Sequence, residues 1–155
     1  MSLPQRFWAK VNKAGPVPAH RPDLGPCWIW KAEKNPKGYG LFRRGSHETR
    51  GPAKMAHRAT YEESKGRIPK GKVPDHLCRV TSCVRPAHLE AVTPRVNTLR
   101  GVGPIAINAR KTHCQHGHPL VGQNIYWCRG VYGPARECMT CKRRNRAKRY
   151  AETGA

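Results

Sequence analysis

The chain is short of acidic residues, of aromatic residues and of long apolar runs. Nine Asp and Glu residues stand against 30 Lys and Arg residues, so the formal net charge is +21 over 155 residues. A charge excess of this size goes beyond what solubility requires and indicates a polyanionic partner. No apolar run approaches the length needed to span a membrane, and no basic amphipathic helix carries bulky aromatic residues. We therefore expect the partner to be nucleic acid and not a membrane.

The scarcity of apolar residues also limits the hydrophobic core. Hydrophobic residues make up 37% of the sequence and aromatic residues 7%, whereas 15 glycines and 14 prolines indicate a loop-rich chain. Small loop-rich chains are usually held together by disulfides or metals. The seven cysteines favour metals, because six of them fall into two sets with histidines and we expect no cleavable leader in the first ten residues. We therefore expect a reducing cytosolic setting and bound zinc.

One stretch combines a clear local pattern with reactive side chains. Residues 72–75 and 89–92 have the character of two strands, and Thr93 followed by Pro94 predicts a helix that runs to about Arg100. In a unit of strand, loop, strand and helix, His76 ends the first strand and Asn97 lies on the first helical turn. Both side chains can then face one small cleft.

The remaining elements are predicted less sharply. We expect short helices at 2–11 and 55–65, a linker at 102–111 and a helix at 138–150. Residues 27–30 should form a hairpin with 38–43, with Trp28 and Trp30 on the core face and Cys27 and Ile29 on the other. The expected fold is a small, zinc-stabilised α+β protein divided into residues 1–26, 27–101 and 102–155.

Two sets of four residues have the composition of structural zinc sites. The loop between the strands holds Cys78, Cys83 and His88, and Cys27 is the best fourth ligand because structural zinc takes four. The second set combines a Cys-x-x-Cys pair with an upstream cysteine and histidine, namely Cys114, His118, Cys138 and Cys141.

Several residues near these sets have competing roles. His113 and His116 compete with His118, and Cys128 is either a partly buried thiol in a loop beside Trp127 or a replacement for the histidine ligand. His57 can be a core histidine, a catalytic helper or a zinc ligand, in that order of preference.

The ordered run of His76, Cys78, Cys83, His88 and Asn97 resembles the His-Cys box of homing endonucleases, in the HNH or ββα-metal nuclease superfamily. Residues 27–101 as a whole resemble the stand-alone HNH endonucleases common in phage genomes. The resemblance implies a ββα-metal core with the first zinc set intact, a general base at His76, and Asp75 and Asn97 as ligands of a catalytic Mg²⁺ or another divalent cation. The alternative without catalysis is that His76 is simply another zinc ligand.

One position departs from the family pattern. Many relatives have Asn where this chain has Arg85, so an orienting role is lost there and a phosphate contact is the alternative. Basic residues expected to contact DNA are Arg43, Arg44, Arg85, Lys142, Arg143, Arg144, Arg146, Lys148 and Arg149.

The sequence thus predicts a metal-dependent endonuclease of double-stranded DNA, and the family resemblance implies that it leaves 5′-phosphate and 3′-hydroxyl ends. A non-catalytic zinc protein that binds nucleic acid is the alternative. A single active site would nick one strand, whereas a two-fold homodimer could cut both strands of a palindrome. If the protein is phage-encoded, it would act in the cytoplasm of a bacterial host.

Overall fold

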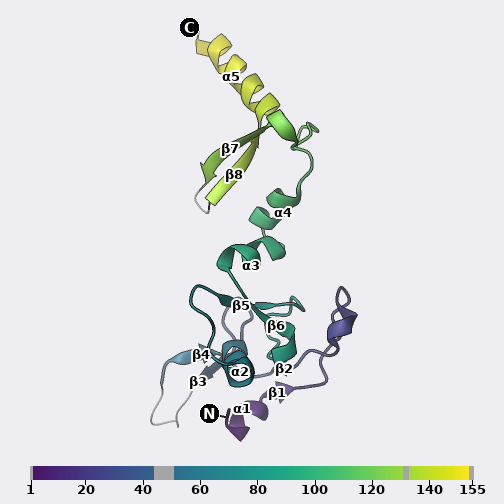
Figure 1. The fold of residues 1–155 in the computed structure, drawn as a ribbon, viewed down its shortest axis with the longest axis vertical. Helices are drawn as coiled ribbons and strands as arrows, with labels where there is room; N and C mark the ends of the chain where they lie inside the picture. The colour runs from purple at the N-terminus through teal and green to yellow at the C-terminus, as the bar shows by residue number, and fades with distance from the viewer. Residues whose placement is uncertain (1, 44–50, 131–132, 154–155) are drawn as a thin grey trace. The chain divides into compact units, whose positions relative to one another are not determined.

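The computed structural model describes residues 2–43, 51–130 and 133–153 and divides the chain into two compact units, Met1–Asn97 and Thr98–Ala155 (Figure 1). Short α-helices alternate with two-stranded antiparallel sheets, which confirms the prediction of a small α+β fold. No described helix is both long enough and apolar enough to cross a membrane.

The core of the first unit is a small aromatic cluster. Phe7, from α1 (Gln5–Trp8), is fully buried, and its ring lies 4.9 Å from the rings of both Trp30 and Phe42. The predicted helix at 2–11 is shorter than expected, because Val11 already belongs to strand β1 (Val11–Asn12). This strand pairs with β2 (Ile29–Trp30), so the last residue of the expected helix is part of a sheet.

The predicted hairpin between residues 27–30 and 38–43 is wrong. Strand β3 (Leu41–Arg43) pairs with β4 (Ala53–Met55). Both edges of β2 are already taken, one by β1 and the other by the loop at Ser82, whose carbonyl accepts the Trp30 N–H at 2.9 Å. Gly40 instead packs against the Trp30 ring, where a Cβ atom would lie 2.5 Å from the indole.

The two faces of β2 separate the core from the cysteines, as predicted. Trp30 belongs to the aromatic core, whereas Cys27 clusters with Cys78 and Cys83, and Ile29 packs against that cluster. The helix predicted at 55–65 is observed as α2 (Ala56–Lys65) and ends at Gly66, whose φ of 80° suits glycine.

The strand, loop, strand and helix of residues 72–100 are present in the predicted order. Strands β5 (Val73–His76) and β6 (Leu89–Val92) pair antiparallel, with His76 opposite Leu89. The loop between them contains the short 3-10 helix η2 (Pro86–His88). Helix α3 (Pro94–Arg100) follows, and the Thr93 side chain accepts the Val96 N–H at 3.3 Å.

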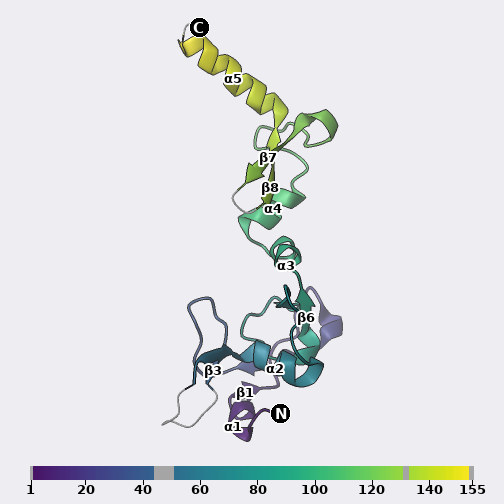
Figure 2. The same cartoon turned by 60° about the vertical axis from the view of Figure 1, so that its left-hand side comes forward.

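The second unit contains a hairpin followed by a long helix. Strands β7 (Ile125–Gly130) and β8 (Gly133–Cys138) lead directly into α5 (Met139–Thr153) (Figure 2). The helix predicted at 138–150 is therefore observed from the next residue onward. The 3-10 segment η3 (Gly122–Asn124) precedes the hairpin.

Two expectations for this unit are wrong. The predicted linker at 102–111 contains helix α4 (Pro104–Arg110), which begins with proline at a position where its missing N–H costs nothing. Cys128 lies on β7 opposite Ala135 and not in a loop, because the chain around it is fully paired in the hairpin.

Candidate active site and metal centres

The first zinc set is brought together from two segments that are distant in the sequence, Cys27 and the loop between β5 and β6. The ligand atoms of Cys27, Cys78, Cys83 and His88 all lie within 4.8 Å of one another, and all four residues are buried. His88 Nδ1 is 3.6 Å from the Cys27 sulfur and 3.5 Å from the Cys83 sulfur. Tetrahedral zinc, with Zn–S of about 2.3 Å and Zn–N of about 2.0–2.1 Å, places S and N about 3.6 Å apart. The donor atoms therefore fit zinc in type, number and spacing.

The thiols of this set hold their protons unequally. Burial is the main reason that the pKa of Cys27 is raised to about 11, whereas hydrogen bonding with Cys83 lowers the pKa of Cys78 to about 4. A bound dication would favour the thiolate form of all of them.

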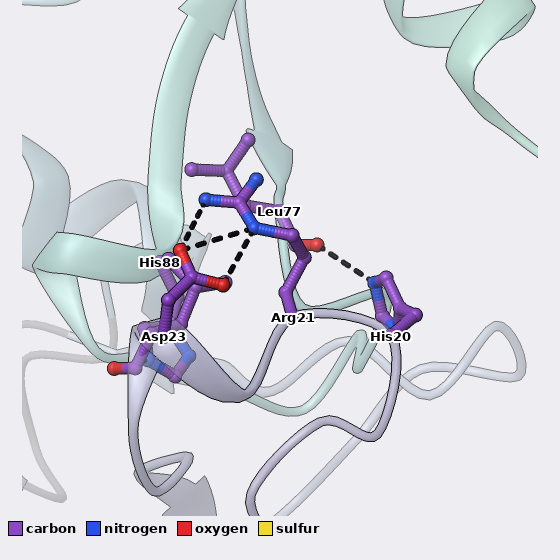
Figure 3. A network of polar contacts seen from close by, with 6 residues as sticks. His20, Arg21, Asp23, Leu77 and His88 are labelled. Carbon is purple, nitrogen blue, oxygen red and sulfur yellow. Dashed lines mark hydrogen bonds and ion pairs between the residues drawn. The ribbon is translucent and has the colours of Figure 1, made fainter.

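A carbonyl outside the set orients the His88 ring. His88 Nε2 lies 2.9 Å from the Leu24 oxygen, and because a carbonyl only accepts, Nε2 carries the proton and Nδ1 is left for a metal. Leu24 ends the 3-10 helix η1 (Pro22–Leu24), beside the surface ion pair of Arg21 and Asp23 (Figure 3). His20, in the same segment, bonds the Leu77 oxygen at 3.1 Å. The segment thus fixes the ligand from outside.

The second set has the same composition and similar spacing. The ligand atoms of Cys114, His118, Cys138 and Cys141 also lie within 4.8 Å of one another. His118 Nδ1 is between 3.3 and 3.7 Å from the three sulfur atoms. The Cys114 and Cys141 sulfurs are 3.7 Å apart, against about 3.8 Å expected around tetrahedral zinc. His118 is thus the histidine of this set, and neither four-residue set of the described chain includes Cys128.

His76 is separate from the first zinc set although it lies beside it. Its Nε2 is 3.0 Å from the Cys83 backbone oxygen, so Nε2 carries the proton and Nδ1 keeps its lone pair. The residue is only 6% exposed, and burial is the main cause that lowers its pKa. The imidazole is therefore neutral near pH 7, with one nitrogen free of a proton.

The residue before it, Asp75, is also buried and forms an ion pair. Arg79 Nη1 donates to Asp75 Oδ1 at 2.7 Å. Arg79 has a φ of 57°, in the left-handed region where residues other than glycine are uncommon. The backbone at this turn directs the guanidinium back to the carboxylate. Sequence reasoning missed Arg79, because neither its backbone conformation nor its partner has a sequence signature.

A second histidine lies against His76. The rings of His57 and His76 are 4.7 Å apart, and Tyr39 lies 5.3 Å from the first and 5.8 Å from the second. His57 comes from α2, is 4% exposed, and has its Nδ1 buried without a hydrogen-bond partner among the described residues. Burial and, secondarily, the neighbouring His76 lower the pKa of His57 to about 3. His57 belongs to neither zinc set.

The other predicted site residues lie on separate elements. Asn97 lies half-buried on α3, and its N–H bonds the Thr93 oxygen. Arg85 Nη1 donates to the Pro26 oxygen at 2.8 Å, which joins the end of the ligand loop to the segment before Cys27. Arg43 is exposed on β3, and Arg44 lies outside the described residues. The six predicted basic residues of α5 are exposed: Lys142, Arg143, Arg144, Arg146, Lys148 and Arg149.

Comparison with known proteins finds similarity in the central part of the chain. Residues 54–99, which include α2, both strands of the β5–β6 pair and most of α3, match the family model of HNH endonucleases. Protein 7.7 of Escherichia phage T7 is 35% identical over 72 residues, which cover 46% of this chain and 52% of that protein. The chain thus spans about half the length of this relative. No solved structure matches significantly.

Proposed function

Because residues 54–99 match the family model of HNH endonucleases, we propose that the protein is a metal-dependent endonuclease that hydrolyses phosphodiester bonds of double-stranded DNA. In this proposal β5, β6 and α3 form a ββα-metal core within a nuclease domain at residues 27–101. The observation that carries the proposal is the state of His76, a buried neutral imidazole whose proton is held on Nε2 by the Cys83 carbonyl.

His76 acts as the general base in this scheme. Its Nδ1 lone pair accepts a proton from a water molecule while the water oxygen attacks the phosphorus atom. The carbonyl of Cys83 stabilises the imidazolium that forms, because it accepts a hydrogen bond from the Nε2–H group throughout. In this proposal the bond between phosphorus and the 3′-oxygen breaks and the departing oxygen takes a proton from solvent, which leaves 5′-phosphate and 3′-hydroxyl ends.

Asp75 and Asn97 would hold the catalytic divalent cation. Carboxylate and amide oxygens are donors that suit Mg²⁺, which usually takes one or two protein oxygens and completes its shell with water and phosphate. When bound, such a cation neutralises charge on the scissile phosphate and on the departing oxygen. Arg79 steadies the Asp75 carboxylate through Oδ1 in this arrangement.

The first zinc site supports the base through the residue that they share. Cys83 contributes its sulfur to the zinc set and its backbone oxygen to His76. Zinc bound at this site would fix the loop that sets the His76 tautomer. Zinc at the second site would stabilise the C-terminal unit, whose basic helix α5 would contact phosphates. We propose Arg43, Arg44 and Arg85 as further phosphate contacts. We place the protein in the cytoplasm of a bacterial host and leave a homodimer as the arrangement that would cut both strands.

A plasmid assay separates this proposal from a non-catalytic nucleic-acid-binding protein. Zinc-loaded protein is incubated with supercoiled plasmid, with Mg²⁺ or Mn²⁺ and without either ion. We expect nicked or linear DNA only with the divalent cation, and sequencing of the ends should identify 5′-phosphates. If the protein retards the plasmid in a gel but leaves it supercoiled under every cation tested, the non-catalytic alternative is correct.

A further inference from the structure

The C-terminal unit has a basic groove beside the second zinc set, and this groove shares Lys142 and Arg149 with the basic helix α5. The groove measures about 430 Å³, and α4, the segment with Cys114 and α5 contribute to its walls. Its lining includes four cationic side chains and one carboxylate, namely Lys111, Arg136, Lys142, Arg149 and Glu137. Glu137 is already paired with Lys142 at 3.4 Å. The remaining charge favours an anionic occupant.

Arg136 is fixed in this groove by backbone oxygens. Its Nη2 atom donates to the Lys111 oxygen at 3.0 Å and to the Asn108 oxygen, both at the end of α4. The guanidinium therefore links β8 to α4 inside the unit. A cation held in this way can face a phosphate without first losing side-chain freedom.

An exposed tryptophan lies next to Arg136 on the hairpin. Trp127 is directly opposite Arg136 in the β7–β8 register, so the two side chains project from the same face. Trp127 is 60% exposed, although tryptophan is usually largely buried in folded proteins. Arg129, two residues further along β7, is exposed and projects from this face as well. A flat aromatic surface thus stands between cations at the edge of the groove.

We propose that this face binds a single strand of DNA, with its phosphates along the basic groove and an unpaired base stacked on Trp127. Duplex DNA hides its base faces within the stack, so an exposed indole can stack only where a base is unpaired. The cations select a polyanion, and the indole selects a strand with accessible bases. The choice of DNA as the polymer rests on the proposed function. The geometry of the groove is independent of that function.

Binding can be measured without cleavage, so this proposal can fail independently of the nuclease. The full zinc-loaded chain is titrated with fluorescein-labelled oligothymidylate and with a labelled duplex, in buffer without Mg²⁺. We expect Trp127→Ala to weaken binding of the single strand about tenfold and of the duplex less than twofold. Trp127→Phe keeps a ring and should stay within about threefold of the wild type for both.

Two further readouts keep the result unambiguous. Saturating oligothymidylate should quench tryptophan emission of the wild type and should quench it much less in Trp127→Phe, which retains the other three tryptophans. Lys111→Gln with Arg149→Gln should weaken binding of the single strand more than the charge-matched pair Lys10→Gln with Lys31→Gln, both exposed in the first unit. Equal losses for the single strand and the duplex in Trp127→Ala, or unchanged binding, would overturn the proposal.

Discussion

Cys83 serves two sites with two different atoms. Its sulfur belongs to the buried Cys3His set, and its backbone oxygen accepts the His76 Nε2 proton at 3.0 Å. A change in the metal loop is therefore transmitted to the imidazole within one residue. At the scale of single residues, the candidate zinc site and the proposed general base are linked through the atoms of Cys83 and one hydrogen bond.

The ligand assignments predict a definite metal stoichiometry. Cys27→Ser should lower bound zinc from two to one per chain, because a hydroxyl is a poor replacement for a buried thiolate ligand. Cys128→Ser is the matched control, since Cys128 lies on β7 and belongs to neither set. Metal analysis of both purified variants checks this. Two zinc ions in Cys27→Ser would remove Cys27 from the first site.

His57 predicts an acid-dependent loss of stability. Burial lowers its pKa to about 3 in the folded protein, whereas an unfolded chain has a value near 6.5. The unfolded state therefore binds more protons as the pH falls below 6.5, and folding loses free energy until the folded pKa is reached. Between pH 7.5 and 5.5 this group alone costs about 1.4 kcal/mol.

Replacing His57 isolates its contribution from that of the zinc ligands. His57→Gln lacks the titrating group, so its unfolding free energy should fall less between pH 7.5 and 5.5 than that of the wild type. Urea unfolding at both pH values measures the difference, and the zinc sites affect both proteins alike. An identical pH dependence would mean that His57 is not held neutral by burial.

At the scale of elements, local sequence patterns were enough to predict helices and strands whose partners are close in the sequence. The alternation at 89–92, and Thr93 before Pro94, predicted β6 and α3 with bounds that the structure reproduces. The partner of β2 could not be predicted in this way. One edge of β2 pairs with β1, and the other meets the Ser82 segment, more than 50 residues later in the chain.

In the candidate site, too, some features could be predicted from the sequence and others depend on tertiary contacts. Spacing and composition predicted both Cys3His sets, because metal ligation demands particular residue types in fours. The contacts of Arg79 with Asp75, and of Tyr39 with His57 and His76, depend on a backbone turn and on tertiary packing. Helix α4 was missed although its proline start was visible, because two isoleucines among seven residues resemble a strand as much as a helix.

We expect the basic residues of helix α5 to determine much of the salt dependence of DNA binding. All of its described side chains from Lys142 to Tyr150 are exposed, so its charges are available to phosphates. Each phosphate contact contributes a slope of about −0.9 in a plot of log K against log salt for duplex DNA. Replacing Arg143, Arg144 and Lys148 by glutamine should make the slope shallower by up to about 2.7 units.

The control for this helix removes the same charge elsewhere. Glutamine replacements of three exposed lysines of the first unit, Lys10, Lys31 and Lys34, leave α5 intact. Duplex affinity is measured by anisotropy over a range of salt concentrations for both triple variants. Equal changes in slope would indicate a general effect of net charge and would contradict a contact surface on α5.

At the scale of the whole molecule, the apolar core is small, and each of the two units contains one Cys3His cluster. The net charge of +21 opposes compaction, and bound zinc would supply stabilisation that the aromatic cluster of the first unit cannot supply alone. The same charge would attract the DNA that we propose as the substrate. Metal-dependent folding and nucleic-acid binding would then both follow from this composition.

The most direct test of the central claim is single-turnover plasmid cleavage by His76→Ala, beside the wild type and the control His113→Ala. His113 is an exposed histidine outside both metal sets. We predict that His76→Ala loses at least about 100-fold in rate while it keeps two zinc ions and wild-type DNA affinity. His113→Ala should cleave normally. Cleavage by His76→Ala at the wild-type rate would contradict the assignment of His76 as the general base.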